Sequence, residues 1–221
     1  MIMMRILNIQ KHSLFNRWLM LLACMVLFPY SLLAYEDYED IVASFNNDVK
    51  IKVRVEGSTV TILGPVDRNI SYIYIDRAGL ELYRGGTYLG FYKITSIAAD
   101  AFKDCKNLKY FSSEASITSI GDRAFQGCSN LSYYEWTNNL KSIGSNAFSG
   151  CTSLSAVHFS DKLESIADSA FSGCTSLSNI HFPDNLKSIG SNAFQYCEAL
   201  REVELPKGLT SIESEAFQNC I

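Results

Sequence analysis

The most reactive side chains in this 221-residue chain are its seven cysteines. A zinc site needs converging thiolates, usually from close C-x-x-C pairs, and the sequence contains no such pair. A nucleophilic cysteine is single and has a base beside it, whereas six of these cysteines recur every 23 residues. We therefore predict no metal centre and no catalytic cysteine. The six regular positions are Cys105, Cys128, Cys151, Cys174, Cys197 and Cys220.

Packing explains this column of thiols better. A free cysteine behaves as a small hydrophobic residue with a weak S–H donor, and that donor can bond to a carbonyl in a turn. Disulfides between successive units are the less favoured alternative, because the side chains would project in parallel rather than toward each other. We expect six buried, reduced thiols with a structural role.

Other chemistry finds no support in the chain. The motifs G-x-S-x-G and H-E-x-x-H and the glycine-rich phosphate loop do not occur, so we predict no enzymatic activity and no cofactor. With 19 basic against 23 acidic residues, the basic excess typical of a nucleic-acid binder is missing. The 48% hydrophobic and 19% charged residues indicate a folded chain.

The elements that position the thiols follow from the same period. Ala-Phe pairs recur every 23 residues from Ala101-Phe102 to Ala216-Phe217, and isoleucines recur likewise from Ile97 to Ile212. Each unit combines a short alternating strand, such as the one that ends at Val157 and Phe159, with a second extended piece and a turn. Stacked units bury these apolar columns against one another. A leucine also follows each of the first five cysteines by three positions: Leu108, Leu131, Leu154, Leu177 and Leu200.

The turn has its own start and stop residues. One column of side-chain oxygens is expected to cap the free N–H groups of a helical turn. A second column suits a left-handed residue that closes the turn. Tyr196 interrupts the second column, which predicts a different closure for the fifth turn. The first column is Asp122, Ser145, Asp168, Ser191 and Ser214, and the second is Asp104, Gly127, Gly150, Gly173 and Asn219.

The pattern I-G-x-x-A-F-x-G-C-x-x-L-x-x-V-x-F runs from Ile143 to Phe159 and again from Ile166 to Phe182, almost position by position. It resembles the 23-residue repeat of the BspA-like leucine-rich repeat family, over about Ile94 to Ile221. The resemblance implies a right-handed leucine-rich repeat solenoid, β-rich, with short strands on the concave face and short helical or 3-10 turns. It also implies a secreted or cell-surface protein used for adhesion and protein recognition.

Two regions precede the six units of residues 94–221, of which the last is incomplete. Residues 1–34 show the basic, apolar, acidic order of a secretory signal peptide, which predicts export and no membrane span in the mature chain. An uncleaved anchor and a lipid on Cys24 remain open alternatives. Residues 35–93 are out of register with the repeat and are predicted as a β-rich N-terminal capping region, with a hairpin from Val49 to Ile62.

The outward positions of the strands are the candidate contact sites, because the inward positions are needed for the core. Tyrosine is enriched in binding surfaces, so the tyrosine end of this face is the first candidate for a protein or glycan ligand. The alternative is that the tyrosines only cover the sheet. One outward column is Tyr110, Tyr133, Ala156, Asn179 and Glu202, and the other is Ser112, Glu135, His158, His181 and Glu204.

Two histidines at successive rungs, flanked by Glu135 and Glu204, could in principle bind a transition metal. Unlike charges on neighbouring strands are also ordinary cross-strand pairs. We favour the second interpretation and predict no metal.

Three functions follow as hypotheses. The leading one is a secreted or cell-surface recognition and adhesion module that binds a protein or glycan through the exposed strand face. The second is a structural surface protein that self-associates through its uncapped C-terminal coil, because Cys220-Ile221 stops before the next expected leucine. That open end is also expected if the chain is part of a longer repeat protein. An extracellular enzyme is the least favoured.

Overall fold

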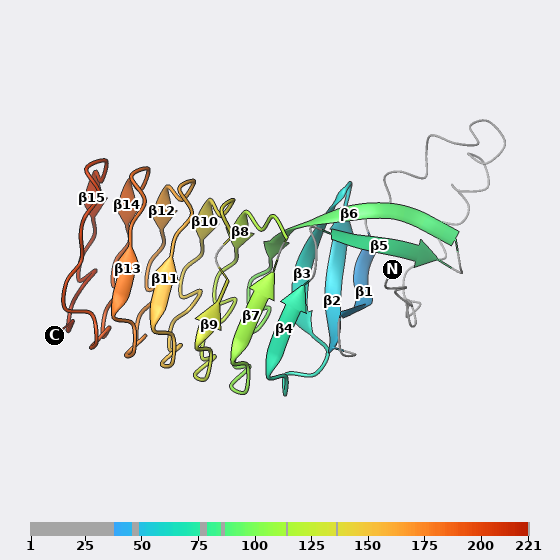
Figure 1. Ribbon diagram of the computed structural model, residues 1–221, viewed down its shortest axis with the longest axis horizontal. Helices are drawn as coiled ribbons and strands as arrows, with labels where there is room; N and C mark the ends of the chain where they lie inside the picture. The colour runs from blue at the N-terminus through green and yellow to red at the C-terminus, as the bar shows by residue number, and fades with distance from the viewer. Residues whose placement is uncertain are drawn as a thin grey trace.

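The computed structural model describes residues 38–45, 49–75, 79–84, 87–113, 115–135 and 137–220. Within these ranges the chain forms fifteen strands and no helix, and successive coils stack along one axis (Figure 1). The predicted signal peptide and Cys24 lie outside the described residues. The strands are β1 (Tyr38–Phe45), β2 (Val49–Glu56), β3 (Thr59–Pro65), β4 (Tyr72–Ile75), β5 (Gly79–Arg84), β6 (Thr87–Ile97), β7 (Tyr110–Ser113), β8 (Ser119–Ile120), β9 (Tyr133–Tyr134), β10 (Ser142–Ile143), β11 (Ala156–His158), β12 (Ser165–Ile166), β13 (Asn179–His181), β14 (Ser188–Ile189) and β15 (Ser211–Ile212).

Two walls of strands run along the stack. One wall is a ten-stranded sheet in the order β1-β2-β3-β6-β8-β10-β12-β14-β15, with β5 also paired to β6. The other wall consists of the sheets β4-β7-β9 and β11-β13. From β6 onward the neighbours are parallel and in register at the repeat interval, as in Ser142 with Ser165 and His158 with His181. The prediction of one coil per repeat unit is thereby confirmed.

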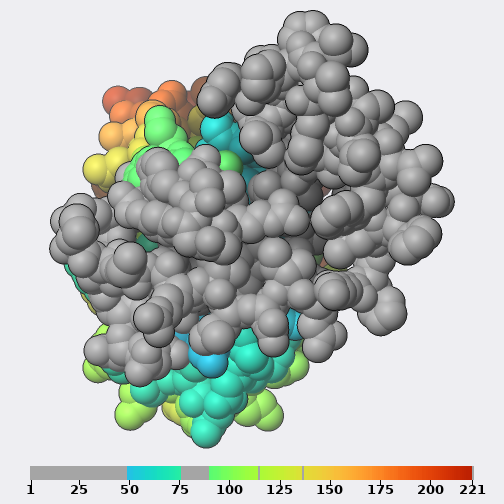
Figure 2. Space-filling view, turned by 90° about the vertical axis from the view of Figure 1, so that its right-hand side faces the viewer, coloured from blue at the N-terminus to red at the C-terminus, as the bar shows by residue number. Residues whose placement is uncertain are grey.

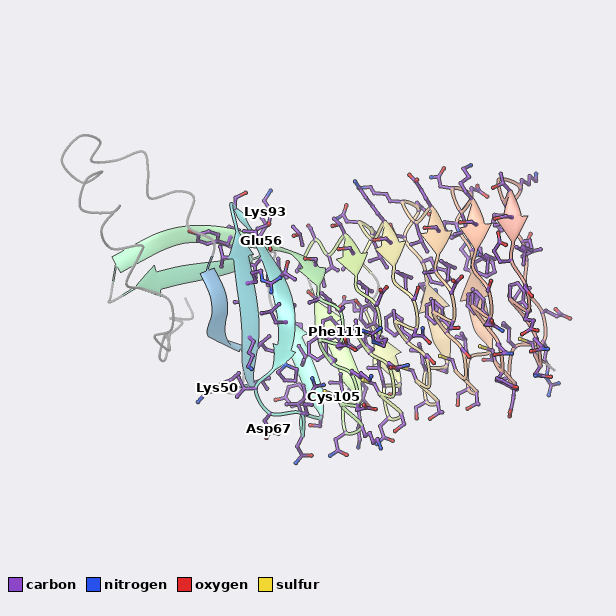
Figure 3. All side chains as sticks on the ribbon, turned by 180° about the vertical axis from the view of Figure 1, so that it is seen from behind. Lys50, Glu56, Asp67, Lys93, Cys105 and Phe111 are labelled. Carbon is purple, nitrogen blue, oxygen red and sulfur yellow. The ribbon has the colours of Figure 1, made fainter. Side chains whose placement is uncertain are left out.

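The core lies between the walls and consists of the repeated apolar columns. Phe102, Phe125, Phe148, Phe171 and Phe194 are fully buried, and neighbouring rings in the column stack with centroids 5.0–5.3 Å apart. Figure 3 shows Cys105 and Phe111 in the first repeat coil, close to the N-terminal strands. Each coil leaves one apolar side uncovered until the next coil packs on it, so the burial depends on stacking.

The connections between the walls are not helical, which corrects the prediction of helical or 3-10 turns. In the first coil only alternate N–H groups bond within the turn, as Lys103 does to the carbonyl of Asp100, while the N–H groups of Asp100 and Phe102 donate to the next coil. Left-handed φ angles of 58° at Asp100 and 57° at Asp104 interrupt the run of right-handed residues that a helix needs. The turn is therefore shared between coils.

The expected N-terminal caps of these turns are also absent from the described residues. Asp122 and Asp168 accept hydrogen bonds through Oδ1, but from the N–H groups of Ser145 and Ser191 in the next coil, each at 2.8 Å. These carboxylates join neighbouring coils instead of capping their own turn, because no helical turn exists there to leave free N–H groups.

The turn-closing column is left-handed as predicted at Asp104, the three glycines and Asn219. The prediction for Tyr196 is wrong: its φ is 60°, and its N–H donates to the carbonyl of Gln218 at 2.9 Å, like its equivalents in other coils. Its side chain is 47% exposed and projects into solvent, so the large ring does not clash with the neighbouring coils. The bond to the next coil holds the backbone in the same geometry despite the unfavourable residue type.

Replacing Tyr196 by glycine should therefore raise the free energy of unfolding by about 1 kcal/mol, because glycine adopts the left-handed region without the penalty of a Cβ. Urea denaturation followed by circular dichroism measures the change. The matched control is Gly173→Ala at φ 73° in the preceding coil, which should lower stability by about the same amount. A less stable Tyr196→Gly protein would show that the tyrosine side chain contributes more than its backbone costs.

The N-terminal region contains the predicted hairpin. Strands β2 and β3 pair antiparallel from Ile51 with Pro65 to Glu56 with Thr59, around Gly57 at φ 58°. The β-rich character expected for residues 35–93 is present in β1 to β6. In the view along the stack from this end, the blue-green atoms of residues 50–75 are visible, with the orange C-terminal coils behind (Figure 2). The stabilising role of this region as a cap remains a prediction.

This region also holds a coil that the 23-residue period does not reveal. Strand β3 is parallel to β6, with Ile62 opposite Ile97, and β4 is parallel to β7, with Tyr72 opposite Tyr110. Contacts between this coil and the first repeat coil join residues 35 or 38 positions apart instead of 23. The chain forms the β5–β6 hairpin after β4 and before Ile97. This inserted hairpin explains why the interval between equivalent residues is 35 or 38 instead of 23.

Two residues of this early coil contact the first repeat turn. The Arg68 guanidinium donates to the carbonyl of Lys103. In the next coil the equivalent carbonyl, Gln126, accepts a backbone N–H from Asp104 at 2.7 Å. Gly64 lies so close to the Ala101 carbonyl that a Cβ would come within 2.0 Å of its oxygen. The Arg68 side chain thus supplies to the Lys103 carbonyl the hydrogen bond that a backbone N–H supplies to the equivalent carbonyl in the next coil.

Candidate recognition surface

The predicted contact residues from Tyr110 to His181 lie on the outer side of the wall formed by β4, β7, β9, β11 and β13, whereas Glu202 and Glu204 lie in a segment that forms no strand, which corrects the prediction of a strand there. Parallel register places Tyr110 beside Tyr133, Ala156 beside Asn179, and His158 beside His181. Inward neighbours such as Phe111 and Val157 are fully buried, so alternation along each strand points the candidates outward. Tyr110, Tyr133, His158, Asn179, His181, Glu202 and Glu204 are exposed, and Ser112 and Glu135 are half-buried.

Two tyrosines that the sequence prediction missed extend this surface toward the N-terminus. Tyr72 pairs in register with Tyr110, and Tyr74 with Ser112. The exposed fractions are 37% for Tyr72, 40% for Tyr74 and 52% for both Tyr110 and Tyr133. We call Tyr72, Tyr74, Tyr110 and Tyr133 the tyrosine patch. The alternation Tyr-Ile-Tyr-Ile over residues 72–75 was the signal available in the sequence.

Toward the C-terminal coils, polar side chains replace the tyrosines on this surface. At the second rung, the Ser112 hydroxyl donates to the Glu135 carboxylate. Glu135 is half-buried, whereas Glu202 and Glu204, which follow the last strand of this wall, are exposed. The outer wall therefore offers aromatic surface beside the early coil and carboxylates beside the last one.

The two histidines are neighbours, but no third ligand joins them. His158 and His181 pair in register on β11 and β13. In the part of the chain that the structure describes, no group of three or more His, Cys, Asp or Glu side chains is placed to hold a metal ion. The histidines are better described as polar members of the outward column.

The six cysteines lie away from this surface. The first five are fully buried, Cys220 is half-buried, and none forms a disulfide. From Cys128 onward each thiol donates to a phenylalanine carbonyl of the preceding coil, at Sγ–O distances of 3.0–3.3 Å. Burial raises the pKa of Cys128 and of Cys197 to about 12. Such thiols are poor nucleophiles, because the thiolate is the reactive form.

Comparison with known proteins finds relatives with the same repeat architecture. The family model for the BspA type leucine rich repeat region matches residues 95–221 in six copies. A leucine-rich repeat protein from Bacteroides ovatus is 24% identical with a TM-score of 0.58, over 79% of this chain and 50% of that one. A leucine rich cell surface protein from Faecalibacterium prausnitzii is 24% identical with a TM-score of 0.55, over 86% of this chain and 53% of that one. No curated protein matches the chain.

These similarities establish the repeat fold. Because both solved structures are only 24% identical to this chain, they support its fold and nothing more. The chain spans about half the length of each. Among the described residues, no helix has the length and apolar character to span a membrane.

Proposed function

Because the chain belongs to the BspA-type leucine-rich repeat family, we propose that it is a recognition module, secreted or at a cell surface, that binds a protein or glycan through its outer strand wall. The observation that carries this proposal is the tyrosine patch. Four partly exposed tyrosines on three adjacent strands form one aromatic surface, whereas most of the other aromatic side chains among the described residues are buried.

Tyrosine suits this role for physical reasons. Its ring offers a large apolar contact area with few rotatable bonds, and its hydroxyl supplies a hydrogen bond, so little conformational entropy is lost on binding. The neighbouring Ser, His and Asn side chains of the same wall can adapt their hydrogen bonds to a partner. Solenoids present extended surfaces of this kind without needing a pocket.

The proposal includes no catalytic role and no cofactor. The polar side chains of the wall occupy repeat positions, and an enzyme would need a singular group of acid, base or nucleophile around a substrate. Burial raises the pKa of Cys128 and Cys197 to about 12, so these thiols stay protonated at neutral pH.

A binding screen tests the proposal. The chain is probed against immobilised extracellular matrix and serum proteins, mucins and bacterial surface extracts, and each hit is measured again with variants. Tyr110→Ala and Tyr133→Ala should each weaken binding at least tenfold, because a central aromatic contact is worth about 2 kcal/mol.

Asn179→Ala is the matched control, since it lies in the same outward column beyond the patch. It should change binding less than threefold, and thermal denaturation should show all three variants folded. Equal binding by the wild type and both tyrosine variants would place the contact site elsewhere.

A further inference from the structure

Strand β2 places a row of positive charges on the outer face of the ten-stranded wall. Lys50, Lys52 and Arg54 alternate along it with three fully buried apolar residues, so their side chains leave the strand on the side away from the core. Both lysines are exposed, and Arg54 is partly exposed. Because a strand advances about 3.3 Å per residue, successive members of the row lie about 6.6 Å apart.

A fourth positive charge on β6 belongs to the same face. Glu56 on β2 pairs with Thr59 on β3, and Thr59 pairs with Lys93 on β6. Residues that pair directly across neighbouring strands share one face of the sheet, and Lys93 is exposed. In Figure 3, Lys50 lies near one end of β2, while Glu56 and Lys93 lie near its other end. We call the four cations the basic face: Lys50, Lys52, Arg54 and Lys93.

The three lysines of the basic face are not neutralised by the described part of the chain. Within that part, Arg54 pairs with Glu56 at 3.9 Å, between side chains that are 40% and 57% exposed. No ion pair there joins a lysine of the basic face to a carboxylate. On β1, the residues opposite Lys50 and Lys52 are uncharged. The positive field of the lysines is therefore available to an anionic partner.

Hydroxyl groups lie beside these cations. Thr59 and Thr61 occupy outward positions of β3, and Ser96 on β6 pairs with Thr61. Thr59 Oγ1 donates to the Glu56 carbonyl at 3.0 Å, and the hydroxyls of Thr61 and Ser96 share a hydrogen bond of 2.7 Å. A hydroxyl has one donor and two acceptor sites. These bonds therefore orient the side chains and still leave acceptor sites for a polar ligand.

The opposite wall has a different character. Strands β4, β7, β9, β11 and β13 contain no lysine or arginine, and three of them carry the tyrosine patch. The core lies between the two walls, so the basic face and the tyrosine patch are on opposite sides of the stack. The basic face therefore suits a second ligand with chemistry of its own.

The arrangement is complementary to a linear sugar polymer that carries anionic groups at short intervals. Cations in a row match its anions, and the hydroxyls of β3 match its hydroxyls. Proteins that bind single-stranded nucleic acid stack successive bases on aromatic side chains. Near this face one exposed aromatic ring, that of Phe91, occurs among the described residues, and the exposed tyrosines of the patch lie on the other wall. The observations thus favour a glycan over a nucleic acid.

We propose that the basic face binds a sulfated polysaccharide. Lys50, Lys52 and Lys93 hold its sulfate groups, and the hydroxyls of β3 bond to hydroxyls of the sugar rings. Lysine is a compact charge on a flexible stem, so the row accepts sulfates at somewhat irregular intervals. Because the tyrosine patch is on the other side of the stack, the polysaccharide and a ligand of the patch bind independently.

A labelled heparin hexasaccharide is the probe, and fluorescence anisotropy should show saturable binding to the full chain. Raising the salt concentration should weaken this binding, because exposed charges are screened. Lys50→Glu/Lys52→Glu should weaken it at least tenfold, because two attractive contacts become repulsive. Thermal denaturation shows whether the variant is folded. If the glutamates unfold it, Lys50→Gln/Lys52→Gln removes the charges alone and should weaken binding about fivefold.

The matched control is Lys141→Glu/Lys187→Glu, which changes the net charge by the same amount. Both lysines are exposed and directly precede outer strands of the same wall, β10 and β14, away from the basic face. This variant should bind the hexasaccharide within about threefold of the wild type, because distant exposed charges are largely screened. Equal losses in both double variants would show a general charge effect and contradict the proposal, as would the absence of saturable binding.

Other polyanions separate a glycan site from simple charge attraction. Desulfated heparin should bind at least tenfold more weakly than the sulfated hexasaccharide. A single-stranded DNA oligonucleotide of equal charge, or vesicles of anionic phospholipid, should also bind more weakly. Any of these three binding as tightly, with the same dependence on Lys50 and Lys52, would overturn the proposal. Tyr110→Ala and Tyr133→Ala should bind the hexasaccharide like the wild type, so this site and the proposed function of the tyrosine patch can fail separately.

Discussion

Phe148→Ala is expected to lower the free energy of unfolding by about 3–5 kcal/mol, the usual range for a buried phenylalanine. The ring is fully buried and stacks on Phe125 at 5.1 Å and on Phe171 at 5.3 Å. It also meets the ring of Tyr134 edge-on at 5.2 Å. Removing it leaves a cavity that the coils on both sides cannot close, because hydrogen bonds between turns fix their spacing.

The matched control is Phe217→Ala in the last coil. Among the described residues Phe217 stacks on one ring, that of Phe194 at 5.3 Å, and it is half-buried, so its loss should cost about half as much or less. Urea denaturation with circular dichroism and tryptophan fluorescence compares the two variants. Equal losses would mean that stability is spread over the stack without regard to the number of neighbours, against the nearest-neighbour behaviour of repeat proteins.

Much of this core could be predicted from the sequence, because each apolar column repeats at one interval without insertion. Six isoleucines, six Ala-Phe pairs and six cysteines constrain one another, so stacked coils were the one arrangement that buries all of them. The turn geometry could not be predicted in the same way. Left-handed residues occur at Arg123, Ser169 and Glu215, types without a strong preference for that region, because bonds to the next coil impose the conformation.

The early coil and half of the tyrosine patch escaped prediction for another reason. Tyr72 pairs with Tyr110 across an interval of 38 residues, so a search at the 23-residue period does not align them. An inserted hairpin changes the spacing without changing the packing. The outward columns from Tyr110 to His181 could be placed because alternation needs only one well-defined strand, while their ligand depends on side chains that the core does not constrain.

Alkaline pH should destabilise the protein from about pH 9 upward through its buried thiols. Burial raises the pKa of Cys128 and Cys197 from the ordinary value of 9.0 to about 12. Above pH 9 the unfolded chain loses these protons and the folded chain keeps them, so the stability that the neutral thiols confer is lost as the pH rises toward 12. Each of these two thiols should cost about 1.4 kcal/mol between pH 7 and 10 and about 4 kcal/mol by pH 12.

The remaining thiols act in the same direction. Burial raises the pKa of Cys151 and Cys174 well above the ordinary value, and that of Cys105 and Cys220 to a smaller degree. Cys128 and Cys197 alone should cost about 3 kcal/mol at pH 10, which is a large part of the stability of many domains, and the other buried thiols add to this loss. Urea denaturation at pH 7 and pH 10 under reducing conditions measures the loss.

Lysine and tyrosine side chains also titrate in this range, so a thiol variant is needed to assign the effect. The Cys128→Ala/Cys197→Ala protein should be less stable at pH 7, because it loses two thiol hydrogen bonds and some packing. It should nevertheless lose about 3 kcal/mol less than the wild type between pH 7 and pH 10, since two of the ionising groups are gone. A pH dependence identical to the wild type would show that both thiols ionise as readily in the folded chain as in the unfolded one. The buried column would then be open to solvent, and the stacked coils would separate far more easily than their hydrogen bonds suggest.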